Sequence, residues 1–176
     1  GLEMATSGRI LIGDKDVTKL PATDRDVSMV FQSYALFPHM SVLENVAYGL
    51  GFSGFPKSEA RDRALAGLDL VGLKGYDDRL PSELSGGQQQ RVAVARALVL
   101  EPQVLLFDEP LSNLDAKLRR QVREDIRAIQ KDLGLTVVYV THDQEEALAV
   151  SDEIVVMRNA SIAPIGTPRP LYDAPV

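Results

Sequence analysis

The chain has 176 residues, of which 45% are hydrophobic and 25% charged, which is the balance of a globular protein with room for one well-formed core. Lys and Arg number 19 against 25 Asp and Glu, so the net charge is −6 and there is no broad basic surface for nucleic acid. The sequence has no cysteine, which excludes disulfides and thiolate metal sites, and no apolar run of about 18 or more residues that would cross a membrane.

The first part of the chain predicts short strands followed by helices. Arg9–Ile12, followed by Gly13, predicts a strand and a turn, and Val27–Phe31 predicts a second strand that ends on Gln32. From about Val42 to Val99 the apolar residues recur with a helical period. We therefore expect a mostly helical insert after an initial sheet segment.

The second part alternates strands and helices. Val104–Phe107 and Val137–Val140 are continuous apolar runs, the pattern of strands that helices cover on both faces. The segment between them has one apolar helical face, with Asp115 placed to cap the helix and Gly134 placed to end it. Strand, helix and strand in succession predict a parallel pair with a right-handed crossover. A further strand is expected at Ile154–Met157.

Polar side chains follow three of the predicted strands. Gln32 ends the first, Asp108 and Glu109 follow the second, and His142 follows the third. Ligands gather at the carboxyl ends of parallel strands, so these side chains are expected at one site. Asp108 suits a magnesium ion and Glu109 suits the orientation of an attacking water. Taken alone, two solvated loop acids and a capping histidine would explain the same residues.

A glycine pair marks the start of another predicted helix. Gly86 and Gly87 expose backbone N–H groups there, and Ser85 and Gln88 have the spacing of a capping box. The N-terminus of a helix favours anions, so it can hold a phosphate, with the Ser85 hydroxyl as a further donor. An ordinary glycine-entered helix start is the alternative for these residues by themselves.

Together these motifs resemble those of the nucleotide-binding domain of ABC transport ATPases. The matching stretches are the signature at 84–91, the Walker B segment at 104–110, the D-loop at 112–115, the switch histidine at 141–142 and the Q-loop at 30–32. Residues 34–39 and the segments 166–168 and 171–173 resemble the importers for sugars, polyamines, ferric iron or phosphorus compounds.

The resemblance implies an α/β fold of the P-loop NTPase (RecA-like) type. Its parallel-sheet core would comprise residues 1–35 and 102–165, with an inserted helical subdomain at 36–101. Residues 166–176 would begin a linker to a C-terminal regulatory domain.

The resemblance also implies roles for the strand-end residues in ATP hydrolysis, with ATP and Mg²⁺ as cofactors. Asp108 would support Mg²⁺, Glu109 would polarise the water that attacks the γ-phosphate, and His142 would contact that phosphate. Gln32 would sense both Mg²⁺ and the water.

Partners follow from the same resemblance. The resemblance implies a head-to-tail dimer of two nucleotide-binding domains, in which five residues would bind the ATP held by the other copy or lie at the shared interface. These residues are Ser85, Gly86, Gly87, Gln88 and Asp115. Membrane permease subunits, and through them a solute-binding protein, would place the protein at the cytoplasmic face of the inner membrane. An apolar cleft for a permease helix is expected from Tyr34, Leu36, Phe37 and Met40, although these side chains equally suit the interior of the helical insert.

The chain departs from the family because it has no G-x-x-x-x-G-K-[S/T] motif. The resemblance implies that this phosphate loop (Walker A) and its strand lie before Gly1, so that the N-terminal part of the domain is absent. We then expect weak ATP binding, almost no hydrolysis and uncovered apolar surface. A soluble ABC ATPase outside transport and a non-catalytic interaction module are the alternative functions.

Overall fold

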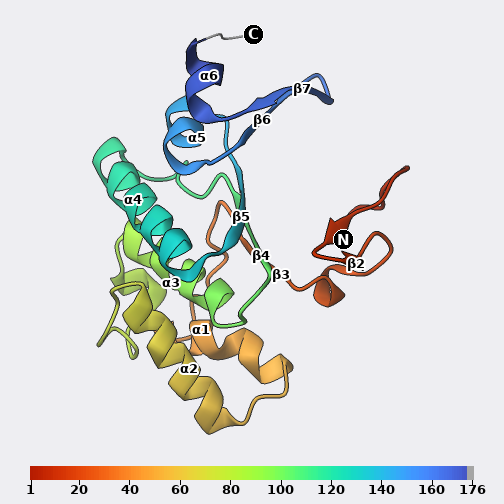
Figure 1. Cartoon of the computed structure of the whole chain (residues 1–176). Helices are drawn as coiled ribbons and strands as arrows, with labels where there is room; N and C mark the ends of the chain where they lie inside the picture. The colour runs from red at the N-terminus through yellow and green to blue at the C-terminus, as the bar shows by residue number, and fades with distance from the viewer. Residues whose placement is uncertain (174–176) are drawn as a thin grey trace.

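The computed structural model describes residues 1–173, which are built around a three-stranded parallel sheet. Its strands are β3 (Val27–Val30), β4 (Val104–Asp108) and β5 (Thr136–Val140), in the order β3-β4-β5. Strands β3 and β4 are neighbours although the whole helical part of the chain separates them in sequence (Figure 1). The predicted parallel pair β4 and β5, joined through a helix, is confirmed.

Three helices fill the segment between β3 and β4, as the apolar period predicts (Figure 1). They are α1 (Val42–Phe52), α2 (Lys57–Leu70) and α3 (Gly86–Leu98). Val42, Val46 and Leu50 of α1 are fully buried where α1 packs against the other two helices, and this segment supplies the larger part of the core. The 3-10 turn Pro81–Glu83 leads into α3.

Helix α4 (Ala116–Leu133) connects β4 to β5, and both of its predicted ends are confirmed. The Asp115 carboxylate accepts hydrogen bonds from the N–H groups of Lys117 and Leu118, and Gly134 ends the helix with a left-handed backbone at φ 61°. An ion pair of 2.6 Å between Arg91 of α3 and Asp125 of α4 joins the two helices.

The expectation that helices cover both faces of β5 is wrong. Val137 and Tyr139 pack against the core, but Val138 is 50% and Val140 52% exposed. Alternate residues of a strand point to opposite faces, and no other element among residues 1–173 covers the second face of β5. Within this part of the chain β5 is also an edge strand, paired only with β4.

The two ends of the described chain form small antiparallel units. Strands β1 (Leu11–Ile12) and β2 (Lys15–Asp16) form a hairpin at the predicted strand and turn. It stands apart from the helices, and the 3-10 turn Ala22–Asp24 follows it (Figure 1). After α5 (Gln144–Val150), β6 (Ile154–Arg158) pairs with β7 (Ser161–Gly166), and α6 (Pro168–Asp173) closes the segment. The predicted strand at 154–157 thus exists but lies in a ribbon separate from the parallel sheet. Residues 174–176 of the expected linker lie outside the described residues.

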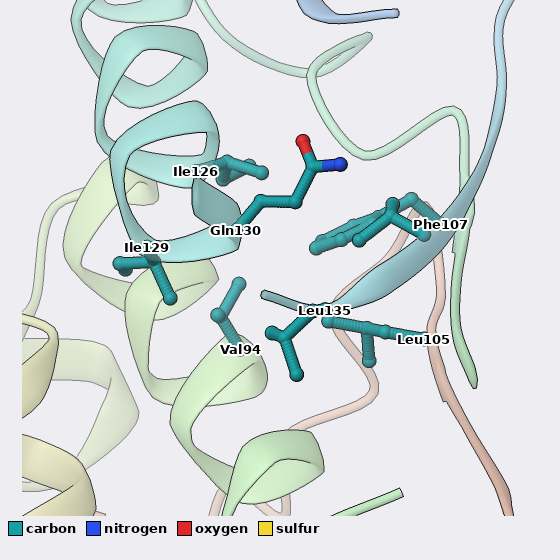
Figure 2. Close-up of a pocket in the computed structure, with 8 residues that line it drawn as sticks. Val94, Leu105, Phe107, Ile126, Ile129, Gln130 and Leu135 are labelled. Atoms are coloured by element: carbon teal, nitrogen blue, oxygen red, sulfur yellow. The ribbon is translucent and has the colours of Figure 1, made fainter. Parts of the chain in front are cut away.

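One small cavity of about 10 Å³ lies between the sheet and the helices α3 and α4. Figure 2 shows Leu105 and Phe107 of β4 facing Ile126 and Ile129 of α4 across it. A cavity of this size holds about one water molecule at most. Its lining is hydrocarbon apart from Gln130, so the cavity is a packing gap in the core and offers no ligand site.

Candidate functional site

The carboxyl ends of β4 and β5 bring Glu109 and His142 into contact. The Oε2 atom of Glu109 lies 3.2 Å from Nδ1 of His142. The backbone N–H of Glu109 donates to the carbonyl of Val140 at 2.9 Å, which ties the two strand ends together. Glu109 has a left-handed backbone with φ 44°, a conformation that costs about 1–3 kcal/mol in a residue other than glycine and that is frequent at functional sites.

Gln32 reaches the same site through the loop after β4. Its side-chain amide donates to Oγ of Ser112 at 3.0 Å, and that hydroxyl donates to the carbonyl of Glu109 at 3.0 Å. The Asn113 amide donates to the carbonyl of Gln32 at 2.9 Å. The structure therefore brings the three predicted strand-end residues Gln32, Glu109 and His142 together. The sequence indicated Ser112 and Asn113 only as parts of a motif, without their bonds to Gln32.

Asp108 is half-buried at the last position of β4, opposite Val140 of β5. Among residues 1–173, no three His, Asp or Glu side chains lie close enough to hold a metal ion by themselves. Mg²⁺ in nucleotide sites takes one or two protein oxygens and completes its shell with water and phosphate oxygens. The carboxylate of Asp108 and the amide oxygen of Gln32 are the types of ligand that could supply these one or two protein oxygens.

A polar hollow of about 70 Å³ opens beside Glu109 and His142. It is lined by Glu109, Ser112, Arg119, Thr141, His142, Asp143 and Glu146. This volume accommodates water molecules, and the lining offers carboxylate, imidazole, guanidinium and hydroxyl groups to orient them.

The floor of the hollow contains a buried acid that the sequence did not reveal. Glu146 of α5 is only 3% exposed, and its Oε2 accepts hydrogen bonds from the hydroxyl groups of Tyr139 at 3.2 Å and Thr141 at 3.0 Å. Burial and then the charge of Glu146 raise the pKa of Tyr139, so its phenol stays protonated and donates. These two hydrogen bonds to Glu146 thus hold the segment 139–146, which carries His142, in place.

The predicted capping box at the start of α3 is confirmed. Oγ of Ser85 accepts from the N–H of Gln88 at 3.3 Å, and the N–H of Ser85 donates to Oε1 of Gln88 at 2.9 Å. The N–H groups of Gly86 and Gly87 stand in the first turn, where a helix offers them no intrahelical acceptor. The positive end of this 13-residue helix is accessible at the exposed Ser85 and the half-buried Gly86, whereas Gly87 is buried.

Both glycines of this helix start allow close packing against the loop 112–115 and α4. A Cβ atom at Gly86 would lie 3.1 Å from Cδ2 of Leu114, and one at Gly87 would lie 2.8 Å from Cδ1 of Leu118. Residues 85–88 do not line the hollow beside Glu109. Within one chain the structure thus separates two groups of predicted site residues, the strand ends and the start of α3. Asp115, between them, uses its carboxylate to cap α4.

The segment after Gln32 differs from the apolar cleft that the sequence suggested. Tyr34 is buried in the core and Leu36 packs against it, because Tyr34 turns inward at a left-handed backbone position. Phe37 remains half-buried and its ring lies tilted against that of Tyr48, with ring centres 4.5 Å apart, and the ring centres of Tyr48 and Phe52 are 5.1 Å apart. The aromatic surface here consists of Phe37, Tyr48 and Phe52.

Comparison with known proteins identifies the family. Residues 1–112 match the family described as ABC transporter. The chain belongs to this family. Its curated ABC relatives include the Fe(3+) ions import ATP-binding protein FbpC of Brucella melitensis, 75% identical over 99% of this chain. The proteins of the same name from Agrobacterium fabrum and Photorhabdus laumondii are 73% and 58% identical over the same share. The chain spans about half, 50%, of the length of each of these relatives.

A solved ABC structure has the same fold. The structure of cbiO1 from Clostridium perfringens, described as part of the ABC transporter complex cbiONQ, superposes with a TM-score of 0.85 and 31% identity over 96% of this chain and 69% of that one. The α/β architecture with a parallel sheet is therefore that of ABC ATPases. In the part of this chain that the structure describes, none of the helices has the length and apolar character needed to span a bilayer.

Proposed function

We propose that this chain forms the hydrolytic part of the ATP-binding subunit of an ABC importer. The observation that carries the proposal is the contact between Glu109 and His142 at the ends of neighbouring parallel strands, with Gln32 bonded into the same loop. Membership of the ABC family makes ATP the ligand that this edge of the sheet would serve.

Each side chain has a task that its position suits. Glu109 accepts a hydrogen bond from the attacking water and orients it, and its left-handed backbone aims the carboxylate at the edge of the sheet. His142 donates toward the γ-phosphate, and Gln32 holds the water and the metal side of the site together. Asp108 and Gln32 would hold Mg²⁺, which neutralises phosphate charge when it is bound.

The head-to-tail dimer rests on the separation of the two groups of site residues. Gly86 and Gly87 offer N–H groups and Ser85 a hydroxyl for phosphate, yet residues 85–88 do not line the hollow beside Glu109 of their own chain. A second copy can bring its start of α3 to the nucleotide held at the strand ends of the first. Asp115, at the exposed N-terminus of α4, would lie at that interface.

The exposed aromatic surface is the part that we assign to a membrane permease subunit. Phe52 is 79% and Tyr48 39% exposed, and both lie on α1. Exposed aromatic clusters are typical of protein interfaces. The names of the relatives support ferric iron as the imported solute, delivered through a solute-binding protein, with the subunit at the cytoplasmic face of the inner membrane.

The proposal is tested by replacing the matching 175 residues of the Brucella melitensis relative with this chain and measuring Mg²⁺-dependent ATP turnover. We expect turnover in this chimera and a loss of about 100-fold or more in its Glu109→Gln variant. The control Glu153→Gln removes an exposed acid that immediately precedes β6, and it should lose no activity. The 176-residue chain alone lacks a G-x-x-x-x-G-K-[S/T] loop and should show almost no turnover.

Two results would favour the alternatives. A folded chimera without turnover that still binds permease subunits would support a non-catalytic interaction module. Turnover combined with capture of ribosomes or DNA in place of a permease would support an ABC ATPase outside transport.

A further inference from the structure

We propose that Arg119 is a positioning residue that couples the loop 112–115 to the segment carrying His142. This proposal rests on the proposed function, because it concerns the same hydrolytic site. Arg119 stands in the first turns of α4, directly after the loop, and its side chain lines the polar hollow. It contacts groups on both sides of that hollow.

On the loop side, Arg119 holds the backbone. Its Nη2 donates to the carbonyl oxygen of Leu114 at 3.0 Å. Leu114 immediately precedes Asp115 and is the residue that Gly86 of α3 approaches. A displacement of this loop therefore moves an atom to which Arg119 is directly bonded.

On the other side, Arg119 pairs with two acids that follow His142 in the chain. Its Nη1 lies 3.5 Å from Oδ2 of Asp143, and its Nε lies 3.7 Å from Oε1 of the buried Glu146. Glu146 accepts from Thr141, and the Oγ1 of Thr141 accepts from the N–H of Asp143 at 3.0 Å. The residues before and after His142 are thus both tied to acids that Arg119 contacts.

Burial makes this arrangement depend on the guanidinium. Glu146 is almost fully buried, and a buried carboxylate without a countercharge is strongly destabilised. The Nε atom of Arg119 is itself buried and makes no hydrogen bond among the described residues. A small movement of residues 141–146 toward α4 would let Nε of Arg119 donate a hydrogen bond to Glu146. The contact therefore has a looser state, the ion pair, and a tighter state, the hydrogen bond.

Coupling of this kind is reciprocal, which gives a direct test on the 176-residue chain by hydrogen–deuterium exchange. In Glu146→Gln, amide exchange should accelerate several-fold in residues 112–116, to which Glu146 makes no hydrogen bond or ion pair among the described residues, as well as in residues 141–147. In Arg119→Gln both segments should exchange faster. Arg120→Gln removes the same charge from an exposed neighbour on α4 and should change neither.

The proposal is overturned if Glu146→Gln leaves residues 112–116 at the wild-type exchange rate. Should Arg119→Gln unfold the chain, seen as faster exchange throughout, Arg119→Lys supplies the reading, because it keeps the charge and loses the fork that reaches three acceptors. Faster exchange in both segments of Arg119→Lys supports the coupling, and faster exchange in one alone contradicts it.

Turnover in the chimera gives a second reading. Arg119→Gln should lower kcat about 10-fold and leave KM for ATP within about 2-fold, since the residue acts through His142 and not on bound nucleotide. An unchanged kcat in an active chimera would overturn the positioning role. A chimera inactive before any substitution would count against the proposed function, while the exchange measurements would still decide the coupling.

Discussion

At the scale of single residues, Arg96 determines the path of the chain after Gln32. Tyr34 and Ala35 have successive left-handed backbones, with φ 60° and 48°. Arg96 of α3 donates to both of their carbonyl oxygens at 2.8 Å. Burial lowers the pKa of Arg96, but a guanidinium stays charged at neutral pH, so both bonds are charge-assisted. This one side chain compensates for two strained residues.

Arg96→Lys should therefore destabilise the chain, because an ammonium group cannot form the same forked pair of bonds. We expect the free energy of unfolding to fall by about 1–3 kcal/mol, measured by urea denaturation. Arg61→Lys, at an exposed position of α2, is the control and should leave the stability within about 0.5 kcal/mol of wild type. Equal stability of the two variants would show that the strained turn holds without Arg96.

Some residues of the site could be predicted from the sequence and others could not. Glu109 and His142 were predictable because each follows a continuous apolar strand, and parallel strands end at one edge. Arg119 and Glu146 gave no such signal. A charged residue on a helix is usually solvated, and only the packing of α4 against α5 brings these two next to each other and buries Glu146.

At the scale of elements, the packing of α2 against α3 depends on Gly67. A Cβ atom at this position would lie 2.5 Å from Cγ1 of Val99, a distance that forces a shift. Val99 is buried and β-branched, so it has few other rotamers to adopt. Gly51 of α1 provides a contrast, since a Cβ atom there meets nothing within 4 Å.

Gly67→Ala should lower the free energy of unfolding by about 1–3 kcal/mol, because overpacking outweighs the gain of about 1 kcal/mol in helix propensity. Gly51→Ala has only the propensity gain and should raise stability by up to about 1 kcal/mol. Thermal unfolding of the two variants beside wild type measures both signs. If Gly67→Ala is as stable as Gly51→Ala, then α2 and α3 separate more easily than their contacts suggest.

Elements were predicted well where local chemistry defines their ends and poorly where distant segments decide their surroundings. The cap at Asp115 and the left-handed Gly134 are local features, and both ends of α4 follow from them. The run 137–140 reads as a fully covered strand, but apolar character alone does not tell which segment covers each face. The structure exposes one face of β5 for that reason.

At the scale of the whole molecule, apolar exposure and net charge oppose each other. Val138 and Val140 on β5, and Val155, Met157 and Ile162 on the β6–β7 ribbon, are all about half or more exposed. Burial of such side chains between copies is favourable, at about 25 cal/mol for each Å² removed from water. The net charge of −6 repels copies from one another, although salt screens that repulsion.

We expect the apolar term to win, so the 176-residue chain should self-associate, and more strongly at high salt, where the Debye length falls to about 3 Å near 1 M. Val138→Thr combined with Val140→Thr should weaken association in sedimentation velocity and leave the unfolding midpoint nearly unchanged, because threonine keeps the strand preference. Val137→Thr is the matched control on the core-facing side, where a buried hydroxyl should lower stability without reducing association. Association that weakens as salt rises would mean that contacts between charged groups hold the copies together, and the exposed face of β5 would then have no part in it.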